Sequence, residues 1–131
     1  MLALLFAVPS QAFAKASLSI TITPSKPAVN ALYTLTIKGK ASKGHLGRHN
    51  NRTVLTRFEQ FGGTCASTPQ EELAQAVAAP GLNPVYLKKG KFKINEPRQA
   101  TPTTGTTIRF CAYLSSKATK VTARATAAYS T

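Results

Sequence analysis

The chain has 131 residues, of which 17 are Lys or Arg and four are acidic, so its formal net charge is +13 at pH 7. All four acidic residues are glutamates, which excludes any catalytic triad or dyad that contains Asp. Such a charge favours anionic partners, although a bias that serves solubility alone is the alternative.

The first 14 residues have the pattern of a secretory signal peptide. Residues 2–8 form an apolar run too short to cross a bilayer, and residues 12–14 (Ala-Phe-Ala) fit the small-x-small cleavage site. The basic n-region is missing, because no Lys or Arg precedes Lys15. We expect export with cleavage after residue 14, leaving 15–131 as one domain that keeps the whole positive charge. A buried N-terminal strand or helix is the alternative.

Alternation of apolar and polar residues predicts strands in the first half of the remaining chain. Residues 17–23 and 32–40 both repeat with period two, as half-buried strands do. A polar, glycine-rich loop then precedes a third strand, expected over 53–61. Its large apolar residues fall on both faces, which is typical of a strand covered on both sides.

A helix is expected over 69–79. Thr68 is a good N-cap, Pro69 suits the first helical position, and Glu71 stands at N3 of a capping box. The helix would have about three turns, too few to be stable alone, so it must pack on the rest of the protein. The i, i+3, i+4, i+7 spacing predicts the packing face, which consists of Leu73, Ala76, Val77 and Pro80.

More strands follow the helix. Residues 84–97 predict two short strands that turn at Lys89-Gly90, with Phe92 and Ile94 facing the core and the intervening lysines facing outward. Residues 107–114 predict the strongest strand, and a last one is expected near 120–130. The core face of the strongest strand consists of Ile108, Phe110, Ala112 and Leu114.

Two cysteines in a chain expected to be exported most simply form one disulfide, Cys65–Cys111. Cys111 alternates with the core face of its strand, so it should face a covering segment, for which the helix is the natural candidate. Two buried free thiols are the alternative. A zinc site would need more ligands at closer spacing than the cysteines with His45 and His49 offer, and we expect neither a metal nor a cofactor.

Six or seven short strands with turn signals between them and one short helix predict an all-β, antiparallel Greek-key sandwich. This pattern, over residues 17–129, resembles the immunoglobulin-like domains of bacterial secreted and surface proteins. The chain departs from antibody domains, because it has no Trp and its first cysteine is not on the second strand. Arg109 also stands two residues before Cys111, where a tyrosine corner has Tyr. The resemblance implies a secreted or cell-envelope module with a binding or structural role.

Two basic clusters contain the candidate polyanion-binding site. One lies in and beside the glycine-rich loop and consists of Lys38, Lys40, Lys43, Arg48 and Arg52, and the other lies at the turn near Lys89-Gly90. Lysine is a strongly hydrated point charge, suited to loose attraction. The aromatic residues do not interleave with the lysines as base stacking requires, so no sequence-specific nucleic-acid binding is expected. The expected partners are an anionic cell-wall polymer, an anionic membrane surface or another surface protein. A solvated edge strand, kept from aggregating by its lysines, is the alternative. The site residues are Lys88, Lys89, Lys91, Lys93, Arg48 and Arg52.

No catalytic residues are predicted. His45 and His49 lie in the glycine-rich loop, a poor place to preorganise a catalytic site, and Glu59 stands alone on the third strand. We therefore expect a protein that is not an enzyme. A small hydrolase that combines a Ser with His45 or His49 and Glu59 is the alternative.

Overall fold

The computed structural model describes residues 16–40, 52–76, 81–86, 91–117 and 120–131. The proposed signal segment 1–14 lies outside them. In chain order the elements are β1 (Ser17–Thr23), β2 (Leu32–Lys40), β3 (Arg52–Phe61), α1 (Pro69–Leu73), β4 (Gly81–Tyr86), β5 (Lys91–Gln99), β6 (Thr107–Lys117) and β7 (Lys120–Ser130).

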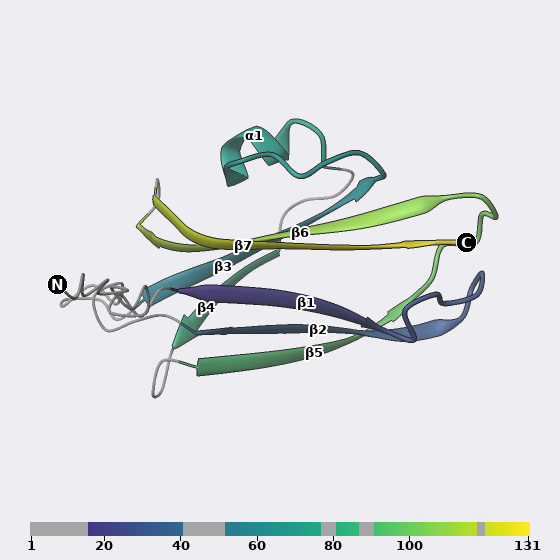
Figure 1. Ribbon diagram of the computed structural model, residues 1–131, viewed down its shortest axis with the longest axis horizontal. Helices are drawn as coiled ribbons and strands as arrows, with labels where there is room; N and C mark the ends of the chain where they lie inside the picture. The colour runs from purple at the N-terminus through teal and green to yellow at the C-terminus, as the bar shows by residue number, and fades with distance from the viewer. Residues whose placement is uncertain (1–15, 41–51, 77–80, 87–90, 118–119) are drawn as a thin grey trace, which may run out of the picture.

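The strands form two antiparallel sheets that pack face to face (Figure 1). One sheet has the order β1-β2-β5 and the other the order β4-β3-β6-β7. The predicted all-β class is therefore confirmed. The two strands predicted over 84–97 are present as β4 and β5, but they do not pair as a hairpin, because they lie in different sheets. The turn expected at Lys89-Gly90 lies outside the described residues.

The main core lies between the sheets and follows from the alternation of β2 and β6. Every second residue of β2 faces inward, as do the residues predicted for the core face of β6. The partly buried Phe92 and Ile94 of β5 pack against the same core. Its buried members are Ile22, Tyr33, Leu35, Ile37, Leu55, Ala100, Ile108, Phe110, Ala112, Leu114 and Tyr129.

Beside this apolar core, four charged side chains join β3 to β5. Arg57 pairs with Glu96, and the Arg98 guanidinium lies 3.2 Å from Glu96 and 3.3 Å from Glu59. Arg98 also sits over the Phe110 ring, 5.2 Å from its centroid. Burial lowers the pKa of Arg57, and Arg98 lowers it further. Two positive and two negative charges thus balance one another between the sheets.

The helix is shorter than predicted and turns a different face inward. The predicted N-cap is confirmed: Thr68 Oγ1 accepts a hydrogen bond from the Glu71 N–H at 3.3 Å. However, α1 ends at Leu73, which is 55% exposed, whereas Glu72 is 0% exposed. The predicted packing face is therefore wrong at Leu73. Ala76 does pack against the sheet, and the other two predicted members, Val77 and Pro80, lie outside the described residues. Glu72 is buried in place of Leu73 because its carboxylate accepts hydrogen bonds from Gln75 Nε2 at 2.9 Å and from the Ala66 N–H at 3.4 Å.

A second, smaller core lies on the outer face of the β4-β3-β6-β7 sheet, under the segment 62–76 that contains α1 (Figure 1). Its buried members are Phe58, Cys111 and Tyr113. The predicted Cys65–Cys111 disulfide is present, with Cα atoms 5.7 Å apart. As expected from strand alternation, Cys111 faces away from the main core. The third strand is covered on both sides, since Leu55 lies in the main core and Phe58 in the outer one.

Candidate anion-binding site

Four lysines form a square array on the outer face of the β1-β2-β5 sheet, which we call the lysine platform. β2 contributes Lys38 and Lys40, and β5 contributes Lys91 and Lys93. The antiparallel register places Lys38 opposite Lys93 and Lys40 opposite Lys91. All four side chains are exposed, because each alternates with an inward-facing neighbour. The array thus holds two directly opposed pairs of like charges.

The platform has no acidic side chain to neutralise it. The chain's only carboxylate side chains are four glutamates, and all four are among the described residues. Glu59 and Glu96 are held between the sheets by arginines, while Glu71 and Glu72 lie on α1, at the outer face of the other sheet. Like charges directly opposite on a sheet are destabilising. An anion on this face would therefore relieve a repulsion that the protein itself does not relieve.

A hollow of about 260 Å³ adjoins the platform. The register aligns Ser17 with Lys40 and Ser19 with Lys38, so these serines and lysines are neighbours on the same outer face of the sheet. Gly39 is required here, because a Cβ atom at this position would lie 2.9 Å from the Ser17 carbonyl oxygen and would overlap the Phe92 ring. The lining residues are Ser17, Leu18, Ser19, Lys38, Gly39, Lys40, Lys91 and Phe92.

The structure brings together only part of the polyanion-binding set predicted from sequence. Lys91 and Lys93 lie on the platform, on the opposite side of β5 from Phe92 and Ile94. Arg52 begins β3, in the other sheet, and its side chain lies outside the described set. The remaining three predicted residues, Arg48, Lys88 and Lys89, fall outside the described residues.

Sequence reasoning missed that Lys38 and Lys40 complete the site. It grouped them with the loop that follows, although the alternation of β2 already assigned Lys38 to the outer face. The signal that was lacking is the pairing of β2 with β5, since these strands are far apart in the chain and nothing local specifies their register.

Other chemistry finds little support among the described residues. Cys65, Cys111 and Glu72 have ligand atoms within 4.8 Å of one another, but the disulfide occupies both sulfurs. Glu59, the acidic residue left open for catalysis, is paired with Arg98. His45 and His49 lie outside the described residues. In the part of the chain that the structure covers, no helix has the length and apolar character to cross a membrane.

Comparison with known proteins adds no family to this picture. No protein-family model matches the sequence, and no curated protein is detectably similar to it.

Proposed function

We propose that this chain is an exported, non-enzymatic, immunoglobulin-like module of the cell envelope or extracellular space that binds anionic polymers through its lysine platform. The observation that carries the proposal is the array itself: two opposed lysine pairs with no carboxylate side chain paired to them. A surface that only needed solubility would gain more from interspersed charges of both signs.

Export rests on two further features. Residues 1–14 have the pattern of a signal peptide, and the Cys65–Cys111 disulfide is typical of an oxidising compartment.

The immunoglobulin-like assignment rests on the strand order. Successive strands cross between the sheets at β2–β3, β4–β5 and β5–β6, so that β2 pairs with β5 in one sheet and β3 pairs with β6 in the other.

The flat, hydroxyl-rich face around the platform supports a polymer as the ligand. Beyond the lysines, the outer positions of β1 and of the middle of β2 are Ser or Thr, and Asn95 follows on β5. Thr36 Oγ1 lies 2.9 Å from Asn95 Oδ1 across the two strands. A repeating anion can therefore place charges on the lysines while its neutral parts meet hydroxyl and amide groups.

The test measures binding to heparin and to poly-glutamate across salt concentrations. The platform variant is K38Q/K40Q/K91Q/K93Q, and the control K15Q/K26Q/K117Q/K120Q removes the same charge elsewhere in the sequence. We expect the platform variant to weaken binding and to flatten its salt dependence by up to about one unit of logarithmic slope per lysine engaged. The control should retain most of both.

Equal losses in the two variants would show that net charge alone drives association, which would overturn the platform as a site. Vesicles that contain phosphatidylglycerol provide a further arm. Binding to these vesicles that exceeds binding to both polymers would assign the platform to a membrane surface instead.

A further inference from the structure

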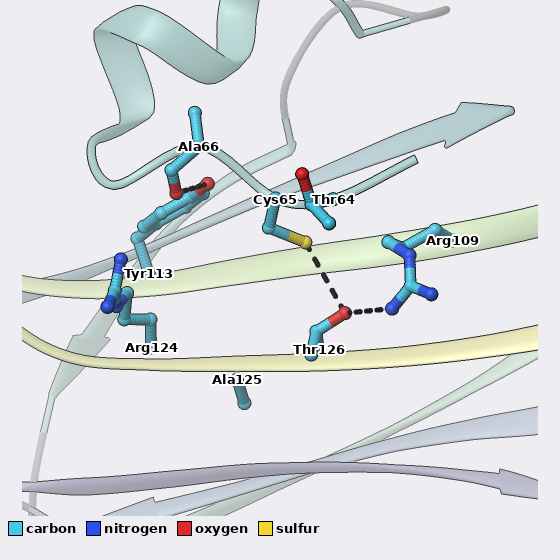
Figure 2. A pocket seen from close by; sticks show the side chains of 8 residues that line it. All are labelled: Thr64, Cys65, Ala66, Arg109, Tyr113, Arg124, Ala125 and Thr126. Atoms are coloured by element: carbon cyan, nitrogen blue, oxygen red, sulfur yellow. Dashed lines mark hydrogen bonds between the residues drawn. The ribbon is translucent and has the colours of Figure 1, made fainter. Parts of the chain in front are cut away.

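A second positively charged site lies on the opposite outer face, where the covering segment meets β6 and β7 (Figure 2). It is a pocket of about 360 Å³, which is within the size range of small-molecule sites. Its lining residues are Thr64, Cys65, Ala66, Arg109, Tyr113, Arg124, Ala125 and Thr126. None of them belongs to the lysine platform.

Two arginines lie at the two ends of this pocket, with Cys65 and Thr126 between them (Figure 2). Arg124 stands opposite Tyr113 in the register of β6 and β7. Arg109 precedes Tyr113 by four residues on β6, which corresponds to about 13 Å along a strand. That figure is the backbone spacing; the Arg109 side chain reaches Thr126, two residues from Arg124 on β7, so the two guanidinium groups lie closer together than the backbones do. A ligand with an acidic group at each end can engage both guanidinium groups, whereas a single compact anion would be shared between two groups that come from separate strands.

The guanidinium at the first end retains unused hydrogen-bonding capacity. Arg109 Nη1 donates to Thr126 Oγ1 at 2.9 Å, while Arg109 Nε is buried and has no hydrogen-bond partner among the described residues. Guanidinium groups present five N–H donors in a planar fork that matches carboxylate and phosphate oxygens. A bound oxyanion would accept hydrogen bonds from those N–H groups of Arg109 that Thr126 does not accept from.

The wall of the pocket is fixed before any ligand arrives. The disulfide holds Cys65 against β6, and the Tyr113 hydroxyl donates to the Ala66 carbonyl at 2.6 Å (Figure 2). Thr126 Oγ1 lies 3.3 Å from the Cys65 sulfur. A site held in this way has little conformational entropy to lose on binding.

No carboxylate side chain lines the pocket. Besides burial, the nearby Glu72 and Glu71 of α1 raise the pKa of Tyr113, but neither lines the pocket, and the Glu72 carboxylate accepts hydrogen bonds from Gln75 and from the Ala66 N–H. The positive charges of Arg109 and Arg124 are therefore not cancelled inside the pocket, and an anionic ligand would meet both.

We propose that this pocket binds a small organic dianion, with one acidic group on Arg109, the other on Arg124 and the middle of the ligand against Thr126 and the disulfide. The site is independent of the lysine platform. Carboxylates and phosphate esters share the oxyanion chemistry, and the probes below distinguish a two-ended ligand from a single compact anion.

The experiment titrates the full chain with digalacturonate by calorimetry at low salt, with neutral galactobiose and inorganic phosphate as comparison probes. We expect digalacturonate to bind, galactobiose not to bind and phosphate to bind at least tenfold more weakly. Arg109→Gln and Arg124→Gln should each weaken digalacturonate at least tenfold. Arg109→Lys keeps the charge without the fork and should fall between wild type and Arg109→Gln.

K38Q/K40Q/K91Q/K93Q serves as the control, because its substitutions lie on the other face. It should bind digalacturonate as wild type does while losing the anionic polymers, so that the two proposals fail separately. Absence of digalacturonate binding, equal affinity in both arginine variants and wild type, or phosphate that binds as tightly as the disaccharide would each overturn the proposal. Melting curves of the variants identify any loss that comes from unfolding.

Discussion

Both outer faces of the sandwich are formed by the same two-residue alternation along the strands, but one face is exposed to solvent and the other is covered by a segment of the chain. Outward positions of the β1-β2-β5 sheet are hydroxyl-bearing or basic for most of their length, and this face is left open to solvent. On the β4-β3-β6-β7 sheet the outward positions include Phe58, Cys111 and Tyr113, which are buried by the segment 62–76. A strand with apolar residues on both faces thus signals a cover, and the chain provides one immediately after β3.

The faces also differ in how they treat charge. The open face has four lysines and no carboxylate side chain, whereas on the other face the cover carries Glu71 and Glu72 on the same side of the sheet as Arg109 and Arg124, without an ion pair among the described residues. The open face therefore suits a long, weakly shaped anion. The covered face encloses a pocket whose walls are held by a disulfide and a tyrosine hydroxyl. Because the covering segment 62–76 forms one wall of this pocket, the pocket can select a ligand by its shape, which the open face cannot do.

Removing the disulfide should have the largest effect on this contrast. The bridge closes a loop with a sequence separation of 46 residues, and chain entropy predicts a loss of about 3 to 4 kcal/mol in the C65A/C111A variant. The measurement is the unfolding free energy in urea. The cover would also loosen, so the variant should bind a hydrophobic dye more strongly as Phe58 and Tyr113 become exposed.

Reduced wild-type protein is the matched control and should resemble C65A/C111A in both measurements. An unfolding free energy within about 1 kcal/mol of oxidised wild type would mean that packing of Phe58 and Tyr113 holds the cover without the bridge.

Local sequence was sufficient for most strands and for the disulfide. Alternation in β2 and β6 placed Leu35 and Phe110 in the core, and the cap at Thr68 placed the start of α1. It failed for the buried face of α1, because the spacing of apolar residues takes no account of hydrogen bonds between nearby polar groups. Apolar spacing assigned Leu73 inward, but Glu72 is buried instead because Gln75 and Ala66 satisfy its carboxylate.

The candidate site shows a different limit, which comes from strands that are far apart in the chain. Lys91 and Lys93 were placed on an outward face by alternation alone, and the structure agrees. Their pairing with Lys40 and Lys38 depends on which strand lies beside β5. The sequence predicted only that the strand before β5 turns into it at Lys89-Gly90, and it named no partner for β5 in the sheet. Which strands pair in a sandwich depends on how the whole core packs, and a short stretch of sequence does not contain that information.

A smaller effect is expected from Tyr113→Phe, which removes the hydroxyl that holds Ala66 in the cover. Loss of this hydrogen bond should cost about 1 kcal/mol at pH 7. The variant should also change the pH dependence. Burial, together with the nearby Glu72 charge, raises the pKa of Tyr113 to about 12. The ordinary value is about 10.

Because the folded protein holds the Tyr113 proton more tightly than the unfolded chain, this contribution is complete below about pH 10. It is lost as pH rises toward 12. Urea unfolding between pH 9 and 12 should therefore give a shallower decline for Y113F than for wild type. Tyr33→Phe is the matched variant in the main core, where burial likewise raises the pKa. Identical slopes for wild type and Y113F would show that the cover does not exclude solvent from this hydroxyl.

The smallest effect, and the one opposite in sign, is expected on the open face. In K38Q/K93Q one opposed lysine pair is replaced by glutamines, and neither side chain contributes to the core. Relief of repulsion between directly opposed like charges should raise the unfolding free energy by a few tenths of a kcal/mol. Salt screens exposed charges, so added salt should narrow the difference between variant and wild type. Urea unfolding at 20 mM and 500 mM salt measures both effects, and K26Q/K120Q is the control, which removes equal charge elsewhere in the sequence.

A gain in unfolding free energy of the same size in the control would attribute the repulsion to the net charge of the whole chain. A loss above about 1 kcal/mol in K38Q/K93Q would mean that the lysine stems pack on the sheet and stabilise the face they occupy.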